Sequence, residues 1–165
     1  MTTHTLKDKV VLITGGAKNL GGLISRRFAE QGAKIAIHYN SAETQADAEQ
    51  TLADVTAFGV DAVLIQADLT DIDNIEKLFL DTKQHFGGID IAINTVGKVL
   101  KKSFLDTTEQ EFDSMSDINS KIAYFFIQSA GRHLNPNGKI CTIVTSLLAA
   151  YTGLYSTYEG LKAPV

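Results

Sequence analysis

The sequence predicts an α/β fold with a doubly wound parallel sheet, and three observations predict it. Short runs of apolar, often β-branched residues alternate with longer segments of helical periodicity, five times along the chain. The short runs are apolar at nearly every position, which is typical of parallel strands covered by helices on both faces. No linker, repeat or low-complexity stretch divides the 165 residues, so we expect one domain, residues 1–165.

Each element has its own signal. The apolar runs predict strands at Val10–Thr14, Lys34–Tyr39, Ala62–Ala67, Ile89–Asn94 and Lys139–Thr145. Apolar residues at helical spacing between these runs, closed by glycines or turn residues, predict helices at Leu20–Gln31, Glu43–Phe58, Asp71–Phe86 and Glu109–Leu134, the last in one or two pieces. Right-handed crossovers between parallel strands favour the strand order 3-2-1-4-5.

Composition excludes several functional classes. A net charge of −4 argues against a nucleic-acid surface, and no apolar run approaches the ~18 residues of a membrane span. Met1–Val10 lacks the apolar segment of a signal peptide. The single cysteine, Cys141, indicates a reducing, cytoplasmic location, and we expect it to be a small buried strand residue. No metal site is expected from the scattered histidines His4, His38, His85 and His133.

A glycine-rich segment, Thr14–Gly22, follows the first strand directly and leads into the first helix. Glycines there turn the chain tightly and let the backbone approach a pyrophosphate, at which the helix points its free N–H groups. Any tight strand-to-helix turn also favours glycine, so the position of the segment carries more weight than its composition. The sequence therefore predicts a dinucleotide site at the end of the first strand.

The same segment resembles the Thr-Gly-x-x-x-Gly-x-Gly motif of the classical short-chain dehydrogenase/reductase family, particularly its 3-oxoacyl-ACP-reductase-like members. The resemblance implies a Rossmann fold in which Gly15, Asn19, Leu20 and Gly21 contact the cofactor. Asn19 replaces the middle glycine of the motif. Asn is among the few non-glycine residues that tolerate a positive φ, so we expect the loop to keep its shape.

The end of the second strand bears on the choice of cofactor. An NAD site usually places a carboxylate there, whereas this chain has Asn40 and Ser41 and no acid before Glu43. Asn40 and Ser41 can donate hydrogen bonds to a 2′-phosphate, and Lys18 lies where NADP-using relatives carry a basic residue. We therefore expect NADP(H) rather than NAD(H). The alternative for Lys18 is an ordinary solvated lysine.

Further segments match the family at the ends of the third and fourth strands. Asp68 and Leu69 follow the third strand, and Asp68 resembles the family's adenine-contacting aspartate. On chemistry alone Asp68 is equally well explained as a helix N-cap. Asn94–Gly97 resembles the family's Asn-Asn-Ala-Gly, which implies that Asn94, Val96 and Gly97 line the cofactor at the switch point of the sheet.

The most specific signal is the pair Tyr158 and Lys162, which share one helix face at i and i+4. A cation beside a phenol lowers its pKa, so the pair forms a credible general acid/base, and the resemblance implies that both residues also contact the cofactor. The resemblance further implies that Ser146 orients the substrate and that Asn119 holds a water for the proton relay. Thr145 rivals Ser146 by strict spacing, but Ser-Leu-Leu-Ala-Ala matches the family after its serine.

These matches imply an NADP(H)-dependent oxidoreductase that transfers a hydride between the nicotinamide and a small-molecule carbonyl or alcohol substrate, with a homodimer or homotetramer as the assembled form. The family's members are longer, so we expect the chain to be incomplete at its C-terminus, truncated before the last strands. Two alternatives stay open, a non-catalytic dinucleotide-binding module or an inactive fragment of such an enzyme. A methyltransferase would require an acid at the end of the second strand, which is absent.

Lys98, Lys101 and Lys102 form a basic cluster after the fourth strand. A solvated loop face is the simpler interpretation of this cluster. The alternative is a role in attracting an anionic substrate to the mouth of the site.

Overall fold

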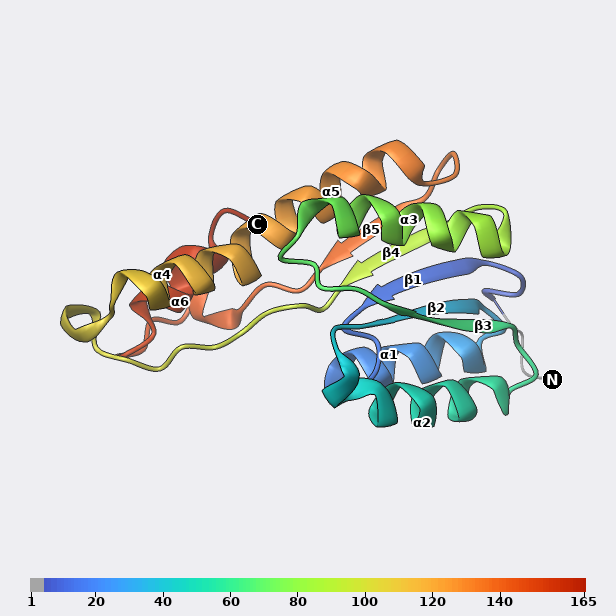
Figure 1. Ribbon diagram of the computed structural model, residues 1–165, viewed down its shortest axis with the longest axis horizontal. Helices are drawn as coiled ribbons and strands as arrows, with labels where there is room; N and C mark the ends of the chain where they lie inside the picture. Colours follow the sequence, from blue (N-terminus) through green and yellow to red (C-terminus); the bar gives the residue numbers. More distant parts are fainter. Residues whose placement is uncertain (1–4) are drawn as a thin grey trace.

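The computed structural model describes residues 5–165, so residues 1–4, including His4, lie outside the described part. Five strands form one parallel sheet (Figure 1): β1(Val10–Thr14), β2(Lys34–Tyr39), β3(Ala62–Gln66), β4(Ile91–Asn94) and β5(Lys139–Thr142). The strand order is β3-β2-β1-β4-β5. This order confirms the predicted fold class.

Helices cover both faces of the sheet. One face carries α1(Asn19–Glu30) and α2(Gln45–Thr56), and the other carries α3(Ile72–Phe86) and α5(Ile122–His133) (Figure 1). Because side chains alternate along a strand, Ile13 and Ile37 pack with the α1 and α2 residues, whereas Leu12 and Ala92 pack with Phe79 of α3 and the α5 residues. All five of these side chains are fully buried.

Three elements differ most from the sequence prediction, and the remaining ends agree with it to within two residues. β5 ends at Thr142, before the predicted Thr145, and the segment predicted to begin at Glu43 divides into η1(Ala42–Thr44) and α2. The predicted helix Glu109–Leu134 forms in three parts, α4(Glu109–Ser116), the π-helical turn η3(Asp117–Lys121) and α5. The C-cap of α4 and the caps on both sides of η3 are all helical, so the three parts make one continuous rod.

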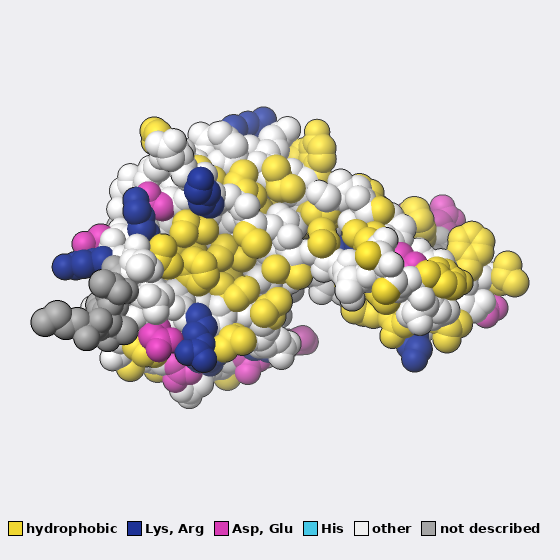
Figure 2. All heavy atoms as spheres, turned by 180° about the vertical axis from the view of Figure 1, so that it is seen from behind, with side chains coloured by type: hydrophobic (Ala, Val, Ile, Leu, Met, Phe, Trp, Pro, Cys, Tyr) yellow, Lys and Arg dark blue, Asp and Glu magenta, His cyan; other side chains and the backbone are white. Residues whose placement is uncertain are grey.

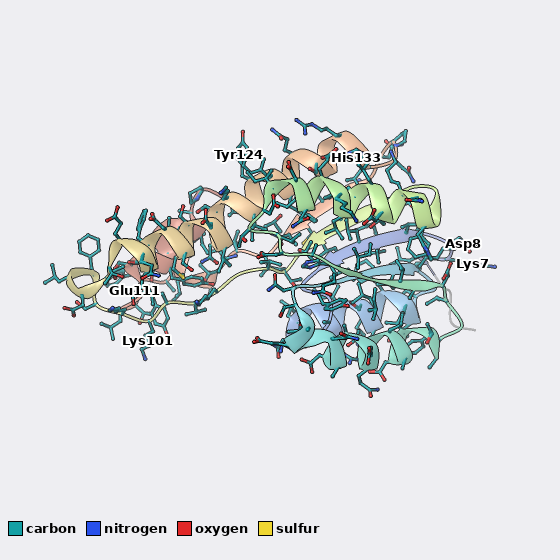
Figure 3. All side chains as sticks on the ribbon, viewed as in Figure 1. Lys7, Asp8, Lys101, Glu111, Tyr124 and His133 are labelled. Atoms are coloured by element: carbon teal, nitrogen blue, oxygen red, sulfur yellow. The ribbon has the colours of Figure 1, made fainter. Side chains whose placement is uncertain are left out.

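An arm projects beyond the carboxyl ends of the strands, on the left in Figure 1. We define the arm as residues 99–116 and 145–165, which contain η2(Phe104–Asp106), α4, η4(Ser146–Leu148) and α6(Ser156–Lys162). The Lys102 Nζ lies 2.8 Å from both carboxylate oxygens of Glu111, which is labelled in Figure 3. This hydrogen bond is the main cause that lowers the Glu111 pKa to about 2, and it ties the loop to α4.

The outer strand β5 corrects one prediction, because Cys141 is exposed rather than buried. β5 is paired only with β4, and Lys139, Ile140 and Cys141 are all exposed. A strand sequence indicates that a residue is extended but not whether its strand is at the sheet edge or covered on both faces. Apolar side chains gather on the far side of the main body and again on the arm (Figure 2).

Candidate functional site

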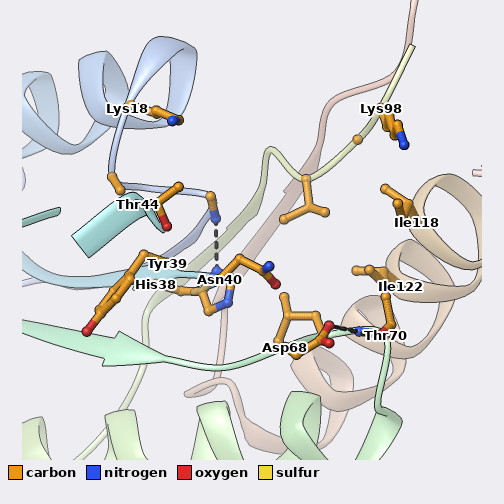
Figure 4. A pocket seen from close by; sticks show the side chains of 15 residues that line it. Lys18, His38, Tyr39, Asn40, Thr44, Asp68, Thr70, Lys98, Ile118 and Ile122 are labelled. Carbon is orange, nitrogen blue, oxygen red and sulfur yellow. Dashed lines mark hydrogen bonds between the residues drawn. The ribbon is translucent and has the colours of Figure 1, made fainter. Parts of the chain in front are cut away.

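A cleft of about 500 Å³ opens at the carboxyl ends of β1 to β4, where doubly wound sheets bind ligands. Figure 4 shows the side chains that line it. The predicted cofactor residues among these are Gly15, Lys18, Asn40, Asp68, Leu69, Val96 and Gly97. The lining also includes His38, Thr44, Lys98 and Ile118. The fold therefore brings together segments from the ends of four strands.

The glycine-rich loop has the geometry of a cradle for an anion. Gly15 has φ +65° and Asn19 has φ +49°, so Asn19 adopts the left-handed conformation that its glycine-like role requires. A Cβ on Gly21 would lie 2.0 Å from the Gly15 carbonyl oxygen, so only glycine fits there. Lys18 is the N-cap of α1 but makes no side-chain cap, and the first turn holds no acid. The first N–H groups of α1 are thus available for a phosphate.

Leu20 and Ser41 do not line the cleft. Leu20 follows Asn19 in the first turn of α1, and its side chain is about half exposed. Ser41 precedes η1, where its carbonyl accepts a hydrogen bond from the Thr44 hydroxyl at 3.0 Å. Thr44 itself faces the cleft, and the sequence prediction missed it. The signal that could have revealed it was its hydroxyl, in the same polar segment as Asn40 and Ser41.

Lys18 is paired with a residue that the sequence prediction did not consider. Its Nζ lies 3.0 Å from Oδ2 of Asp47 on α2, and both side chains are about half exposed. A solvated pair of this kind contributes little to stability, so the Lys18 ammonium can turn toward a ligand phosphate at small cost. Asn40 at the end of β2 is exposed at the same end of the cleft.

Asp68 forms a local turn at the end of β3 and does not cap α3. Its Oδ1 accepts hydrogen bonds from the Thr70 hydroxyl at 2.7 Å and from the Thr70 N–H at 3.0 Å. These bonds, the hydroxyl first, lower the pKa of the Asp68 carboxyl. The N-cap of α3 is Asp71, which accepts from the Asp73 N–H. The cap alternative for Asp68 is therefore wrong, and its carboxylate lies on the cleft wall beside Leu69.

Asn94 holds the loop after β4. Its Oδ1 accepts from the Thr14 hydroxyl at 2.7 Å and from the Val96 N–H at 3.1 Å, so one buried side chain ties β1 to the loop that lines the cleft. Its Nδ2 is buried without a partner among the described residues, as is the hydroxyl of Thr142, its register neighbour on β5.

Asn119 lies in the π-helical turn η3 and is fully buried. Its Oδ1 accepts from the Lys98 N–H at 3.0 Å, and its Nδ2 donates to the Lys98 carbonyl at 2.9 Å and to the Met115 carbonyl at 3.2 Å. The Asn119 side chain thus fixes the loop that follows β4 at Lys98. The predicted water role of Asn119 stays a prediction, carried by its position beside the cleft.

Tyr158 and Lys162 lie on one face of α6, and both are buried, with 9% and 3% of their surface exposed. The Lys162 Nζ donates to the Ile143 carbonyl at 3.1 Å, and no described carboxylate pairs with it. Burial lowers the Lys162 pKa. A Cβ on Gly97 would come within 2.9 Å of this ammonium, so Lys162 lies directly beside a residue that lines the cleft. A buried cation with one carbonyl partner has donors left for a ligand hydroxyl.

Ser146 and Thr145 differ in how their hydroxyls are used. The Thr145 Oγ1 accepts from the Leu147 N–H at 3.3 Å and begins η4. Ser146 is exposed, and within residues 5–165 its hydroxyl makes no hydrogen bond. The Ser146 hydroxyl is therefore the freer of the two to contact a substrate.

The basic cluster after β4 is divided by the fold. Lys98 lines the cleft, whereas Lys101 lies over the Tyr155 ring, 5.9 Å from its centroid. Lys102 pairs with Glu111 within the arm. Of these three lysines, Lys98 is the one placed to attract an anion to the cleft.

His38 is a further cleft residue to which the sequence prediction assigned no role. It is 2% exposed at the end of β2, and Figure 4 shows it between the glycine-rich loop and Asp68. A ring with two polar atoms inside an otherwise apolar strand was the signal available in the sequence. Within residues 5–165 no group of His, Cys, Asp and Glu side chains could hold a metal ion, and no helix is long and apolar enough to span a membrane.

Comparison with known proteins gives concordant matches. The family described as Enoyl-(Acyl carrier protein) reductase matches residues 15–165. The hydroxynaphthalene reductase-like protein Arp2 of Metarhizium anisopliae is 33% identical over 99% of this chain and 61% of its own length. The chain thus spans about three fifths of that relative.

Solved structures agree with this match. A dehydrogenase from Burkholderia cenocepacia with bound NADP is 63% identical, with a TM-score of 0.95 over 100% of this chain and 63% of its own. A short-chain dehydrogenase from Oenococcus oeni is 48% identical, with a TM-score of 0.78 over 96% of this chain and 72% of its own.

Proposed function

The chain belongs to the short-chain dehydrogenase/reductase family, and we propose that it carries the cofactor cleft and proton-transfer pair of an NADP(H)-dependent oxidoreductase acting on a carbonyl or alcohol substrate. The observation that carries the proposal is the position of Lys162. It is a buried ammonium four residues from the buried Tyr158, and it lies beside Gly97, which lines the same cleft as Gly15 of the phosphate loop. A general acid beside a cleft that contains an anion cradle fits a dinucleotide-dependent reaction.

The residues of the cleft fit such a cofactor. Gly21 and Gly15 let the loop backbone pack closely against the first turn of α1 and Thr95, and the uncapped N–H groups of that turn favour a pyrophosphate. Lys162 retains hydrogen-bond donors for a ribose hydroxyl, and Gly97 leaves room beside it. A bound nicotinamide cofactor supplies the hydride.

We assign the protein's part in the reaction to three side chains. In the reductive direction the Tyr158 hydroxyl gives its proton to the substrate oxygen as the carbonyl π bond breaks and the carbon accepts the hydride. Lys162 stabilises the phenolate that remains, because its ammonium lies on the same helix face. The free Ser146 hydroxyl donates to the substrate oxygen and holds it in line with Tyr158. In the oxidative direction the proton returns from the substrate hydroxyl to the Tyr158 phenolate and the hydride leaves the substrate carbon.

NADP(H) is the cofactor we propose. Asn40 and Thr44 present hydrogen-bonding groups, and Lys18 a cation, at the end of the cleft where an NAD site carries an acid. The bound NADP of the Burkholderia cenocepacia relative supports the same choice. Titration with NADP⁺ and NAD⁺ under identical salt tests it, and tighter binding of NAD⁺ would overturn it.

Substitution of Tyr158 by Phe tests the catalytic assignment. We expect NADPH consumption with a panel of ketones to fall by about 10²–10⁴-fold, because a general acid contributes that much. The matched control is Tyr155→Phe, a change of the same kind in the arm beside Lys101, which should retain most of the activity. Equal rates for Tyr158→Phe and the unchanged protein would contradict the assignment. NADPH binding without turnover in either would instead favour a non-catalytic dinucleotide-binding module.

A further inference from the structure

The His38 side chain connects two separate walls of the cleft. Its Nδ1 lies 3.0 Å from the Gly15 N–H in the glycine-rich loop, and its Nε2 lies 2.9 Å from the Ala67 carbonyl, the residue before Asp68. The backbone of the same residue adds a third contact, because the His38 carbonyl accepts from the Gly16 N–H at 2.9 Å. One residue of β2 thus spans the distance between the phosphate loop and the Asp68 turn.

The two partners determine the protonation state of the ring. An amide N–H only donates, so Nδ1 must accept with its lone pair. A carbonyl only accepts, so Nε2 must carry the hydrogen. A single neutral tautomer satisfies both bonds, whereas the imidazolium would direct a second N–H at the Gly15 N–H.

The surroundings keep the ring neutral. Desolvation by burial lowers the His38 pKa to about 4, while the Ala67 hydrogen bond and the nearby Asp68 carboxylate act in the opposite direction more weakly. The acceptor at Nδ1 is therefore present throughout the neutral range. It also removes the Gly15 N–H from the set of donors left for a ligand phosphate.

The contacts fix two segments that have few other ties to each other. Gly15 has φ +65°, and the other ties of its loop run to α1 and α2, since the Gly16 carbonyl accepts from the Ser25 hydroxyl and the Ala17 carbonyl from the Thr51 hydroxyl. Asp68 is held by Thr70 and Asn74 within its own turn, not by the glycine-rich loop. Within the described chain, the His38 ring is the side chain that hydrogen-bonds to both segments.

We propose that His38 is a positioning residue for the cofactor, setting the separation between the phosphate loop and the Asp68 turn without touching the reacting atoms. The inference rests on the proposed function, because it assigns those two walls to one bound dinucleotide. It predicts that cofactor affinity depends on the two ring hydrogen bonds more than on the volume of the side chain.

Three substitutions separate these contributions. His38→Phe keeps a ring of similar size and removes both hydrogen bonds. His38→Asn places an amide oxygen near the Nδ1 position and can keep the Gly15 bond, but it is too short to reach Ala67. The matched control is His133→Phe, which removes a second partly buried histidine that contacts Glu76 and stacks near Phe79, away from the cleft.

Calorimetric titration with NADPH on the 165-residue chain gives the first test. We expect His38→Phe to weaken NADPH binding at least about tenfold, about 1.4 kcal/mol, and His38→Asn, which keeps only the Gly15 end of the bridge, to recover at most part of that loss. The His133→Phe control should bind NADPH as the unchanged chain does, even where it lowers the unfolding midpoint. A folded His38→Phe chain with unchanged NADPH affinity would overturn the proposal, as would full NADPH affinity in His38→Asn, which lacks the Ala67 bond.

A second measurement needs no substitution. Long-range ¹⁵N–¹H spectra of the unchanged chain should show His38 with an unprotonated Nδ1 and a protonated Nε2 between pH 7.5 and 5. An imidazolium or the opposite tautomer in that range would refute the bridge even if His38→Phe fails to fold. Failure of the unchanged chain to bind NADPH would instead overturn the proposed function, and with it the cofactor role of His38, while leaving the bridge to be judged by the spectra.

Discussion

The sheet with its helices and the arm differ in how they cover their apolar side chains. In the sheet, Leu12 and Ile37 are fully buried, whereas in the arm Phe104 is 72% exposed and Leu105 is 89% exposed. The sheet layer is built from consecutive strand–helix units that cover one another. The arm is joined to the sheet layer through η3 and contacts such as the Ser120 hydroxyl with the Leu161 carbonyl.

This difference separates the two halves of the candidate site. The phosphate loop, His38 and Asp68 are held by the sheet layer. Tyr158, Lys162 and Ser146 are held by the arm, although Lys162 itself is as well buried as a core residue. Cofactor binding and proton transfer should therefore respond differently to changes that loosen one region and not the other.

Substitution of Gly21 by Ala should have the largest effect on the sheet layer. The new Cβ would meet the Gly15 carbonyl at 2.0 Å, so α1 and the phosphate loop must separate. We expect the free energy of unfolding to fall by about 2–3 kcal/mol, together with a loss of NADPH affinity. Chemical denaturation and titration measure the two effects. Gly131→Ala on α5, where a Cβ meets nothing within 4 Å, is the control, and an equal loss there would contradict the explanation.

The pH dependence of stability should come next in size and should follow His38. Burial lowers its folded pKa to about 4, below the usual 6.5 of a free imidazole, so the unfolded chain takes up a proton first as the pH falls. The native state should thus lose about 2 kcal/mol between pH 7.5 and 5, before most carboxylates titrate. Denaturant titrations across that range should show a smaller slope for His38→Asn. An unchanged slope in that variant would exclude His38 as the cause.

The smallest of these effects should be confined to the arm. The Thr108 hydroxyl accepts from the Glu111 N–H and caps α4, so Thr108→Ala should destabilise that helix by about 1 kcal/mol. Hydrogen exchange should accelerate in residues 109–116 and stay unchanged in β1 and β2. Acceleration of equal size in both regions would show that the arm and the sheet layer unfold as one unit, which would contradict their separate response to local changes.

The sequence predicted the sheet layer well because its signals are local. Strand type, helix ends and the tolerance of Asn19 for a positive φ depend on neighbouring residues, and the structure has Asn19 at φ +49°. The Lys18–Asp47 pair and the His38 bridge join residues 29 positions apart, which periodicity does not relate. Cys141 was misjudged for a similar reason, since exposure of β5 depends on which strand lies at the edge.

The rod formed by α4, η3 and α5 is fixed at one end and projects at the other. Its α5 end is held against α3 by the hydrogen bond from Ser129 to Glu76, while α4 extends into the arm. A π-helical turn resists bending less than the α-helix on either side, so bending of the rod should concentrate at η3. Asn119 lies at that section and grips the Lys98 backbone. Bending of the arm should therefore move the Lys98 segment of the cleft wall, so the angle at η3 should depend on whether the cleft holds a ligand.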